Sequence, residues 1–323
     1  MSKLSSGCLA LALALAIFAP LTAAAGDWPD HPIHFIVPFP AGGSTDVAAR
    51  VVGGYLSRTL GQQIVVENKS GANGNIAMEY VAKSAPDGYT ILIATDAVSS
   101  NPHVYKMDID PLKDLVAVVE LSRQPIALAA HPSLGVATLA ELTELAKKQP
   151  RLGFATGSGA GSLQAVVGLW YAKLAGITLE QVPYRGGGQA INDLVAGHVK
   201  LGSLGTTPLV PYYKTGGLNL LAQSMATRSP ALPDVPTFQE AGFKELVVEQ
   251  QIGVFVPVGT PAAITTRLNA EVNAALGDEK VRKIFIDQAQ VPAGGTAEQY
   301  ATKVREASEI FARLVKELNV KVE

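Results

Sequence analysis

Residues 38–46 read PFPAGGSTD and lie between the apolar run IHFIV at 33–37 and the stretch VAARVV at 47–52. A strand, a glycine-rich turn and a helix in this order form the unit from which parallel α/β sheets are built. Glycine lets the backbone adopt positive φ and approach a ligand closely, and a helix start offers unpaired N–H groups and partial positive charge. This stretch therefore predicts an α/β fold with a loop suited to an anion.

The alternation of strands and helices extends through the chain, as judged by apolar periodicity and by glycine stop signals. The first series has expected strands at 33–38, 64–67 and 89–94, with helices at 47–60 and 75–83. The second has expected strands at 125–130, 151–155, 179–182, 200–204 and 218–222, with helices at 139–148, 163–175 and 189–196. A strand at 251–256 and amphipathic helices at 261–276, 279–288 and 297–318 complete the expected elements.

These two series predict two α/β lobes. The expected first lobe is residues 26–124 together with 251–323, and the expected second lobe is residues 125–250. The chain would cross between the lobes near Gln124 and return near Gln251, so the two crossings predict a hinge. Ligands of open α/β sheets bind at the carboxyl ends of the strands, which places the expected site in the cleft between the lobes.

Helix capping is the alternative interpretation of the first loop. Ser44 or Thr45 would cap the following helix, and Asp46 would sit favourably in its first turn. We favour this structural role for Asp46. A pair of glycines before a serine exceeds what capping requires, which favours a ligand role for Gly42 and Gly43.

Two further loops have the same design, TGSGAGS at 156–162 and PYRGGG at 183–188. Ser158 and Ser162 fit a capping role and a ligand role equally well. The spacing of the glycines matches neither the phosphate loop nor the dinucleotide fingerprint, which need G-x-x-x-x-G-K-[ST] and G-x-G-x-x-G. The G-x-S-x-G elbow of hydrolases is also absent, so the loops indicate binding rather than catalysis.

The N-terminus predicts secretion. Lys3, the apolar run at 9–21 and the small residues at 23–25 fit a signal peptide cleaved near Ala25, which indicates a periplasmic protein. An uncleaved anchor is the alternative. Cys8 precedes the apolar core and would leave with the peptide, so no thiol or disulfide chemistry is expected. The chain has no run of basic residues and its five histidines are scattered, so we expect no nucleic acid partner, metal site or cofactor.

Several motifs together resemble the Bug-type (TctC) solute-binding proteins of tripartite tricarboxylate transporters. They are WPDHPI at 28–33, VPFPAGGSTD at 37–46, ENKSGANG at 67–74, PDGYT at 86–90, VPYRGGG at 182–188, SPALPDVPT at 229–237 and PVGTP at 257–261. The likeness covers essentially the whole expected mature chain. It implies a two-lobe periplasmic binding protein fold of type II, with two Rossmann-like α/β domains that close on a small, usually carboxylate-bearing ligand.

In such proteins the first loop and its counterparts in the second lobe hold the ligand through backbone N–H groups, hydroxyls and ordered waters. The resemblance implies no catalytic residue. The implied ligand-binding residues are Phe39, Ala41, Gly42, Gly43, Ser44, Thr45, Thr95, Asp96, Gly157, Ser158, Ala160, Gly161, Ser162, Gln164, Tyr184, Thr206 and Thr207.

The chain departs from the family pattern at three places. Thr95-Asp96-Ala97 replaces small neutral residues, Gln164 replaces a frequent histidine, and Gln251-Ile252-Gly253 replaces an aromatic pattern. An aspartate 4 Å from a carboxylate repels it by about 1 kcal/mol or more, depending on the local dielectric. Asp96 therefore suggests a ligand with a carboxylate at one end and an amine, amide or hydroxyl donor at the other. A surface or capping role near Ser99 is the alternative.

The leading functional hypothesis is a monomeric receptor without enzymatic activity. It would bind its ligand between the lobes, close by a hinge and present the closed form to membrane transporter subunits. A secreted α/β hydrolase or lyase is an alternative, although the missing elbow and cysteine count against it. A ligand sensor that feeds a membrane kinase would use the same cleft with a different partner.

Overall fold

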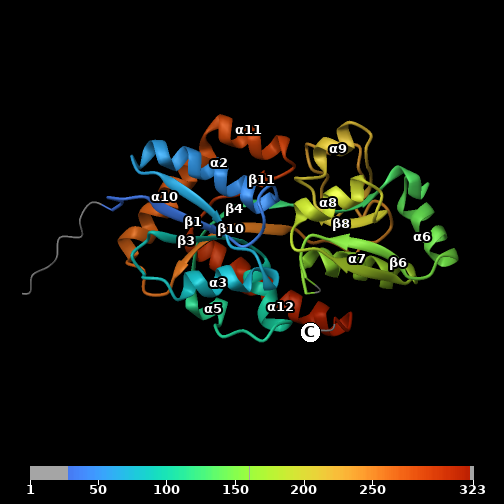
Figure 1. Ribbon diagram of the computed structural model, residues 1–323, viewed down its shortest axis with the longest axis horizontal. Coiled ribbons are helices and arrows are strands. Elements are labelled where there is room, and N and C mark those ends of the chain that lie inside the picture. The colour runs from blue at the N-terminus through green and yellow to red at the C-terminus, as the bar shows by residue number, and fades with distance from the viewer. Residues whose placement is uncertain (1–27, 160, 321–323) are drawn as a thin grey trace, which may run out of the picture.

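The computed structural model describes residues 28–159 and 161–320. The expected signal peptide and the candidate residue Ala160 lie outside the described residues. The described chain forms two α/β lobes side by side, each built on one sheet (Figure 1). This architecture confirms the predicted fold class. Within these ranges, no helix reaches the length and apolar character that crossing a bilayer requires.

The sheet of the first lobe has the strand order β11-β4-β10-β3-β1-β2. Strand β1 pairs in parallel with β2 and β3, whereas β10 is antiparallel to both of its neighbours, β3 and β4. The strands are β1 (Ile33–Val37), β2 (Ile64–Asn68), β3 (Thr90–Thr95), β4 (Leu115–Gln124), β10 (Gln250–Pro257) and β11 (Val291–Pro292).

The sheet of the second lobe has the order β7-β6-β8-β5-β9. Strand β6 pairs in parallel with β7 and β8, and β5 is antiparallel to β8 and β9. The strands are β5 (Ile126–Ala130), β6 (Leu152–Thr156), β7 (Leu179–Pro183), β8 (Leu201–Gly205) and β9 (Asn219–Gln223).

Both sheets are therefore mixed, whereas the sequence pattern predicted parallel sheets. The antiparallel members include β4, β5 and β10, which are the strands at the two chain crossings between the lobes. Strand β4 was not predicted at all, although it is ten residues long. Its sequence LVAVVELSRQ breaks the apolar run with Glu120, which is fully buried and receives a 2.6 Å hydrogen bond from Lys303.

Four of the longer helices begin at capping residues. Thr138 and Thr296 each form a capping box, and Asp278 and Ser162 accept hydrogen bonds from the first turns that they precede. The first lobe contains α2 (Ser44–Thr59), α3 (Asn75–Ala82), α4 (Ala97–Ser100), α5 (Pro111–Asp114), α10 (Ala262–Gly277), α11 (Glu279–Asp287) and α12 (Ala297–Glu317). The second lobe contains α6 (Leu139–Lys148), α7 (Leu163–Ala175), α8 (Gly187–Val195) and α9 (Val210–Lys214).

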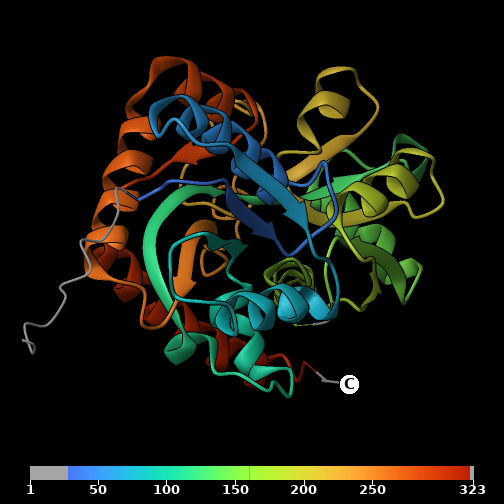
Figure 2. The ribbon, with the colours of Figure 1, turned by 60° about the vertical axis from the view of Figure 1, so that its left-hand side comes forward.

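Helices cover both faces of each sheet. Figure 2 shows α2, α10 and α11 on one side of the first sheet, with α3 and α12 on the other, in agreement with the two apolar clusters of this lobe. Helix α12 also joins the lobes. Its Tyr300 and Val304 pack in the first lobe, whereas Phe311 and Leu314 pack in the core of the second.

Gly253 in β10 offers a test of this packing. A Cβ at this position would collide with the buried ring of Tyr300. We expect Gly253→Ala to lower the free energy of unfolding by about 1–3 kcal/mol, the usual cost of overpacking. The control is Gly54→Ala, at an exposed position of α2 where a Cβ meets nothing within 4 Å. It should leave the free energy of unfolding unchanged or raise it by about 0.5–1 kcal/mol. Urea unfolding measures both, and equal midpoints would contradict the packing argument.

Candidate functional site

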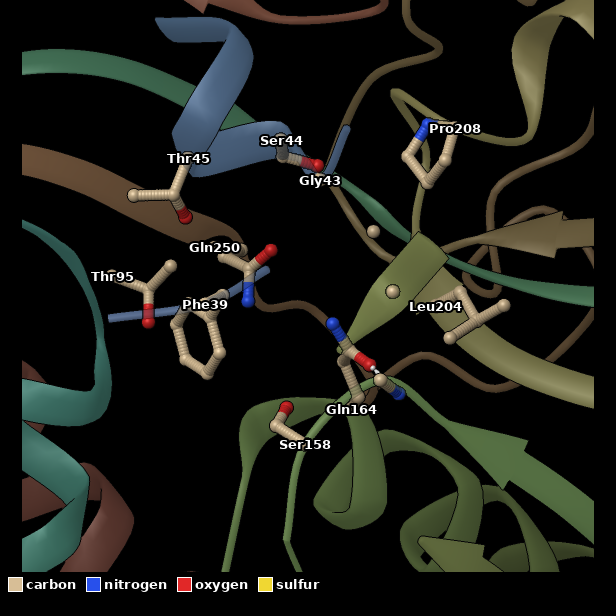
Figure 3. Close-up of a pocket in the computed structure, with 13 residues that line it drawn as sticks. Phe39, Gly43, Ser44, Thr45, Thr95, Ser158, Gln164, Leu204, Pro208 and Gln250 are labelled. Carbon is tan, nitrogen blue, oxygen red and sulfur yellow. Dashed lines mark hydrogen bonds between the residues drawn. The ribbon is translucent and has the colours of Figure 1, made fainter. Parts of the chain in front are cut away.

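A cleft between the lobes is lined by residues from both of them and from the strands that connect them (Figure 3). The carboxyl ends of β3, β6 and β8 and the starts of α2 and α8 meet here, as expected for ligand sites in α/β sheets. The lining residues are Phe39, Gly43, Ser44, Thr45, Thr95, Gly157, Ser158, Gln164, Gly187, Leu204, Gly205, Pro208 and Gln250.

The wall from the first lobe is the start of α2. Gly43 is the N-cap residue, and no side chain accepts a hydrogen bond from the first turn. Ser44 and Thr45 therefore lie inside the helix rather than capping it, which differs from the capping interpretation. Figure 3 shows the hydroxyl of Thr45 directed into the cleft. The helix start thus presents the hydroxyl of Thr45 and uncapped backbone N–H groups to this space.

Asp46 stabilises the loop that precedes α2 through contacts outside the cleft lining. Its carboxylate accepts a 3.0 Å hydrogen bond from the N–H of Gly42, another of 3.0 Å from Asn68, and forms a 3.0 Å ion pair with Arg50. Burial raises the pKa of Asp46, but Arg50, Gly42 and Asn68 outweigh it and hold the pKa below its usual value. Asn68 also donates to the carbonyl of Phe39 at 2.9 Å. These bonds fix the turn that carries Gly42 at φ 87°.

The wall from the second lobe is the loop after β6. The carbonyl oxygen of the Gln164 side chain accepts a 2.7 Å hydrogen bond from the N–H of Gly157, and the hydroxyl of Thr156 donates to the carbonyl of Ser158 at 2.7 Å. Ser203 in β8 donates to the Gln164 backbone at 2.6 Å. Gln164 therefore holds the loop against the sheet, and the loop presents Ser158 to the cleft.

A buried amide junction lies at the base of the cleft. The Gln124 side-chain oxygen accepts hydrogen bonds from the hydroxyls of Ser44 at 3.1 Å and Thr207 at 2.9 Å. Its nitrogen donates to the side-chain oxygen of Gln250 at 2.8 Å. Because the oxygen of Gln250 is engaged in this bond, its nitrogen, which also interacts with the carboxyl of Asp96, is the end that faces the cleft (Figure 3).

Among the described residues, those that line the cleft carry no charged side chain. They offer backbone N–H groups, hydroxyls and amide nitrogens, with Phe39, Leu204 and Pro208 as apolar surface. Uncapped helix starts from both lobes add partial positive charge. Such a site can hold a carboxylate by neutral donors alone. No cluster of three or more potential metal-ligating side chains occurs in the described part of the chain.

The structure brings together many of the residues implied by the sequence. Those that line the cleft are Phe39, Gly43, Ser44, Thr45, Thr95, Gly157, Ser158 and Gln164. Adjacent residues that do not line it are Ala41, Gly42, Gly161, Ser162, Thr206 and Thr207. Thr207 nevertheless bonds Gln124, and Ser162 caps α7.

Tyr184 and Asp96 lie outside the cleft lining. Tyr184 borders a groove at the cleft mouth together with Phe39 and Ser158. Its hydroxyl donates to Asp193 at 2.7 Å, and burial together with Asp193 raises its pKa to about 12. Asp96 lines a separate cavity behind the hinge strands. This placement does not support direct contact between Asp96 and the far end of a ligand.

Sequence reasoning missed several lining residues. Gly187 belongs to the third glycine-rich loop, and Leu204 ends an expected strand. The positions of both could therefore have indicated that they line the cleft. Gly205 and Pro208 follow that strand without a motif. Gln250 precedes the expected strand at 251–256, and only the pairing of β10 with β3 and β4 brings it to the cleft.

The two lobes touch at the rim of the cleft. The N–H of Gly159 in the second lobe donates to the side chain of Asn73 in the first at 3.3 Å. At the base of the cleft, the hydroxyl oxygen of Thr207 in the second lobe also lies 3.0 Å from the carbonyl of Gln288 in the first. The described conformation is therefore one in which the lobes are closed on each other.

The family model of the tripartite tricarboxylate transporter family receptor matches residues 48–320. The chain belongs to this family. Among its relatives, the receptor is 34% identical over 313 residues to protein BugT of Bordetella pertussis, which covers 95% of this chain and 94% of that protein. These matches confirm the resemblance predicted from the motifs.

Solved structures agree with this assignment. Rpa4515 of R. palustris, determined with adipate, has a TM-score of 0.89 and 33% identity over 92% of the receptor and 100% of that chain. MatC of Rhodopseudomonas palustris, with bound malate, has a TM-score of 0.83 and 30% identity over 89% and 100% of the two chains. They support the two-lobe periplasmic binding protein fold.

A close approach of the two lobes at Gly186 and Pro40 suggests a substitution that would hold the lobes of the receptor apart. A Cβ at Gly186 in the second lobe would lie 2.5 Å from the Cδ atom of Pro40 in the first, whereas at Gly188 it would lie 3.5 Å from the nearest atom, the carbonyl of Ala41. We expect Gly186→Ala to increase the radius of gyration in solution because closure is blocked. Gly188→Ala is the control and should leave it unchanged. X-ray scattering measures both, and identical curves would contradict the prediction.

Proposed function

We propose that this receptor binds a small carboxylate-bearing metabolite in the cleft and delivers it to the membrane subunits of a tripartite tricarboxylate-type transporter. The observation that carries the proposal is the convergence of neutral donors from both lobes in a cleft whose described lining has no charged side chain. The adipate and malate complexes of two related structures support a carboxylate ligand.

The proposed ligand contacts come from both sides of the hinge. Gly43 and Ser44 would contribute N–H groups and Thr45 its hydroxyl from the first lobe, Ser158 a hydroxyl from the second, and Gln250 its amide nitrogen. Contacts from both lobes exist together only when the lobes are closed, so ligand binding shifts the population toward that state. The membrane subunits would recognise the closed form.

The remaining parts of the proposal concern organisation and location. The two lobes would divide as residues 26–124 with 251–323 and residues 125–250, with α12 packing on both. The mature receptor would act in the periplasm as a monomer and would release its ligand chemically unchanged. The lining of the cleft, as far as the structure describes it, includes no charged acid–base group, which supports binding over catalysis.

The first test is a thermal-shift screen of the mature receptor. The panel contains malate, adipate and other mono- and dicarboxylates, with the corresponding neutral amides as controls. A ligand at 100 times its Kd adds about 2.7 kcal/mol of stability, which corresponds to a Tm increase of roughly 5–10 °C. The amides should give no increase, and mass spectrometry should recover the ligand intact. Absence of any carboxylate-dependent shift, or conversion of the ligand, would refute the proposal.

The second test removes one proposed donor. Thr45→Val keeps the shape of the side chain but deletes the hydroxyl that faces the cleft. Loss of one hydrogen bond to a charged group costs about 1.5–3 kcal/mol, so the Kd for the best carboxylate should rise at least tenfold. Thr59→Val, on the exposed end of the same helix, is the matched control. Equal affinities of the two variants in calorimetry would exclude Thr45 from the site.

A further inference from the structure

Asp96 has an unusual position between the lobes. It follows β3 in the first lobe and immediately precedes α4. Within the described chain its Oδ1 atom is enclosed and has no hydrogen-bond partner. The carboxyl interacts with the side chain of Gln250 and with the backbone N–H of Leu163. Leu163 begins α7 of the second lobe, so the enclosure of this carboxyl is completed by the other lobe.

Asp96 is half-buried, and its surroundings combine polar and apolar side chains. It lines a cavity behind the hinge strands, and the apolar part of that lining comes from Leu163, Val247, Val248, Ile310, Phe311 and Leu314. Leu163, Phe311 and Leu314 belong to the core cluster of the second lobe. Separation of the lobes would therefore remove apolar atoms from around the carboxyl and expose its enclosed oxygen to water.

The charged groups around this cavity are engaged with one another. They come from β4, from α12 and from the segment before β10. Lys303 bonds the buried Glu120 at 2.6 Å, and Arg123 lies 3.5 Å from Glu249 and 3.8 Å from Glu120. Glu306 also lines the cavity. No cation of the described chain forms an ion pair with Asp96.

Tyr300 of α12 completes the set of titratable groups near Asp96. Its hydroxyl is buried, and burial together with the charges of Glu120 and Asp96 raises its pKa well above the ordinary value. Tyr300 is therefore neutral at physiological pH, so it adds no negative charge beside the carboxylate and, as a phenol, supplies no positive one. The cost of ionising Asp96 in this closed arrangement is left without a compensating cation.

Burial accordingly raises the pKa of Asp96 to about 6, and the interactions with Gln250 and Leu163 lower it only in part. An aspartate exposed to water has an ordinary pKa of about 3.9. The closed state therefore binds more protons than an open state between about pH 4 and pH 6. By linkage, closure becomes more favourable as the pH falls through this window and less favourable as it rises.

We propose that Asp96 takes up a proton as the lobes close, so that the receptor holds its ligand more tightly as the surrounding pH falls. The inference rests on the proposed closure around a ligand. It assigns to Asp96 a regulatory role in place of a ligand contact. The device is specific to a chain with an acid at this position.

Calorimetry of the wild-type receptor provides the direct test. Malate or adipate, whichever gives the larger thermal shift, is titrated at pH 6.0 in buffers of different ionisation enthalpy. We expect uptake of about half a proton per ligand bound, because a group with a pKa near 6 is half protonated there when closed and almost fully ionised when open. Between pH 7.5 and 5.5 the affinity should increase about fourfold.

Two variants separate the carboxyl of Asp96 from that of the ligand. Asp96→Asn keeps the shape but cannot titrate, and it should lose both the proton uptake and the pH dependence in excess of those due to the ligand. Asp108→Asn, at an exposed position in the same lobe, should behave like the wild type. Equal proton uptake by the wild type and Asp96→Asn would overturn the inference and leave the receptor function intact.

A measurement without ligand tests proton uptake by Asp96 independently of the proposed carboxylate binding. X-ray scattering of the ligand-free wild type should show a shift toward compact particles between pH 7.5 and 5.0, equivalent to about a tenfold change in the equilibrium between open and closed states. Asp96→Asn should show no shift. If no carboxylate binds, the proposed function fails while this measurement still decides the inference: a pH-independent wild type overturns it.

Discussion

The buried amide of Gln124 is the interaction on which the rest of the site depends. It is the last residue of β4, where the chain leaves the first lobe, and its side chain contacts the start of α2, the turn at Thr207 and the returning strand at Gln250. Each partner is a polar group in a water-poor junction, where an unmade hydrogen bond costs more than a formed one gains. The junction therefore fixes the cleft walls relative to the hinge.

The charged side chains near the cleft pair with one another outside it. Asp46 and Arg50 pair behind the first loop, and Glu120 and Lys303 pair behind the hinge, so charged groups support the structure from outside the binding space. The described residues that line the cleft offer neutral donors. A carboxylate then gains hydrogen bonds without having to break an existing ion pair, and the helix starts supply the favourable field.

Helix α12 makes the two lobes mechanically interdependent. Tyr300 packs under the first sheet, and Phe311 and Leu314 pack in the core of the second lobe.

The buried Glu120 explains why the sequence did not predict strand β4. A carboxylate inside a strand is tolerated only with a partner such as Lys303, which is 183 residues away in the chain. The sequence did not predict the mixed sheets for a related reason. The direction of a strand relative to its neighbours depends on long-range pairing, such as that of β10 with β3 and β4.

The sequence by itself determined the α/β class, the family, and the loops at 38–46 and 156–162, because strand–glycine–helix signals depend on residues close together in the chain. Ser44, Thr45 and Ser158 follow from those loops. Only the tertiary structure decided that Gln250 and Gly205 enter the cleft, and that Asp96 lies behind it. Those placements depend on β10 inserting between β3 and β4 and on the closure of one lobe against the other, which are long-range contacts that no local pattern encodes.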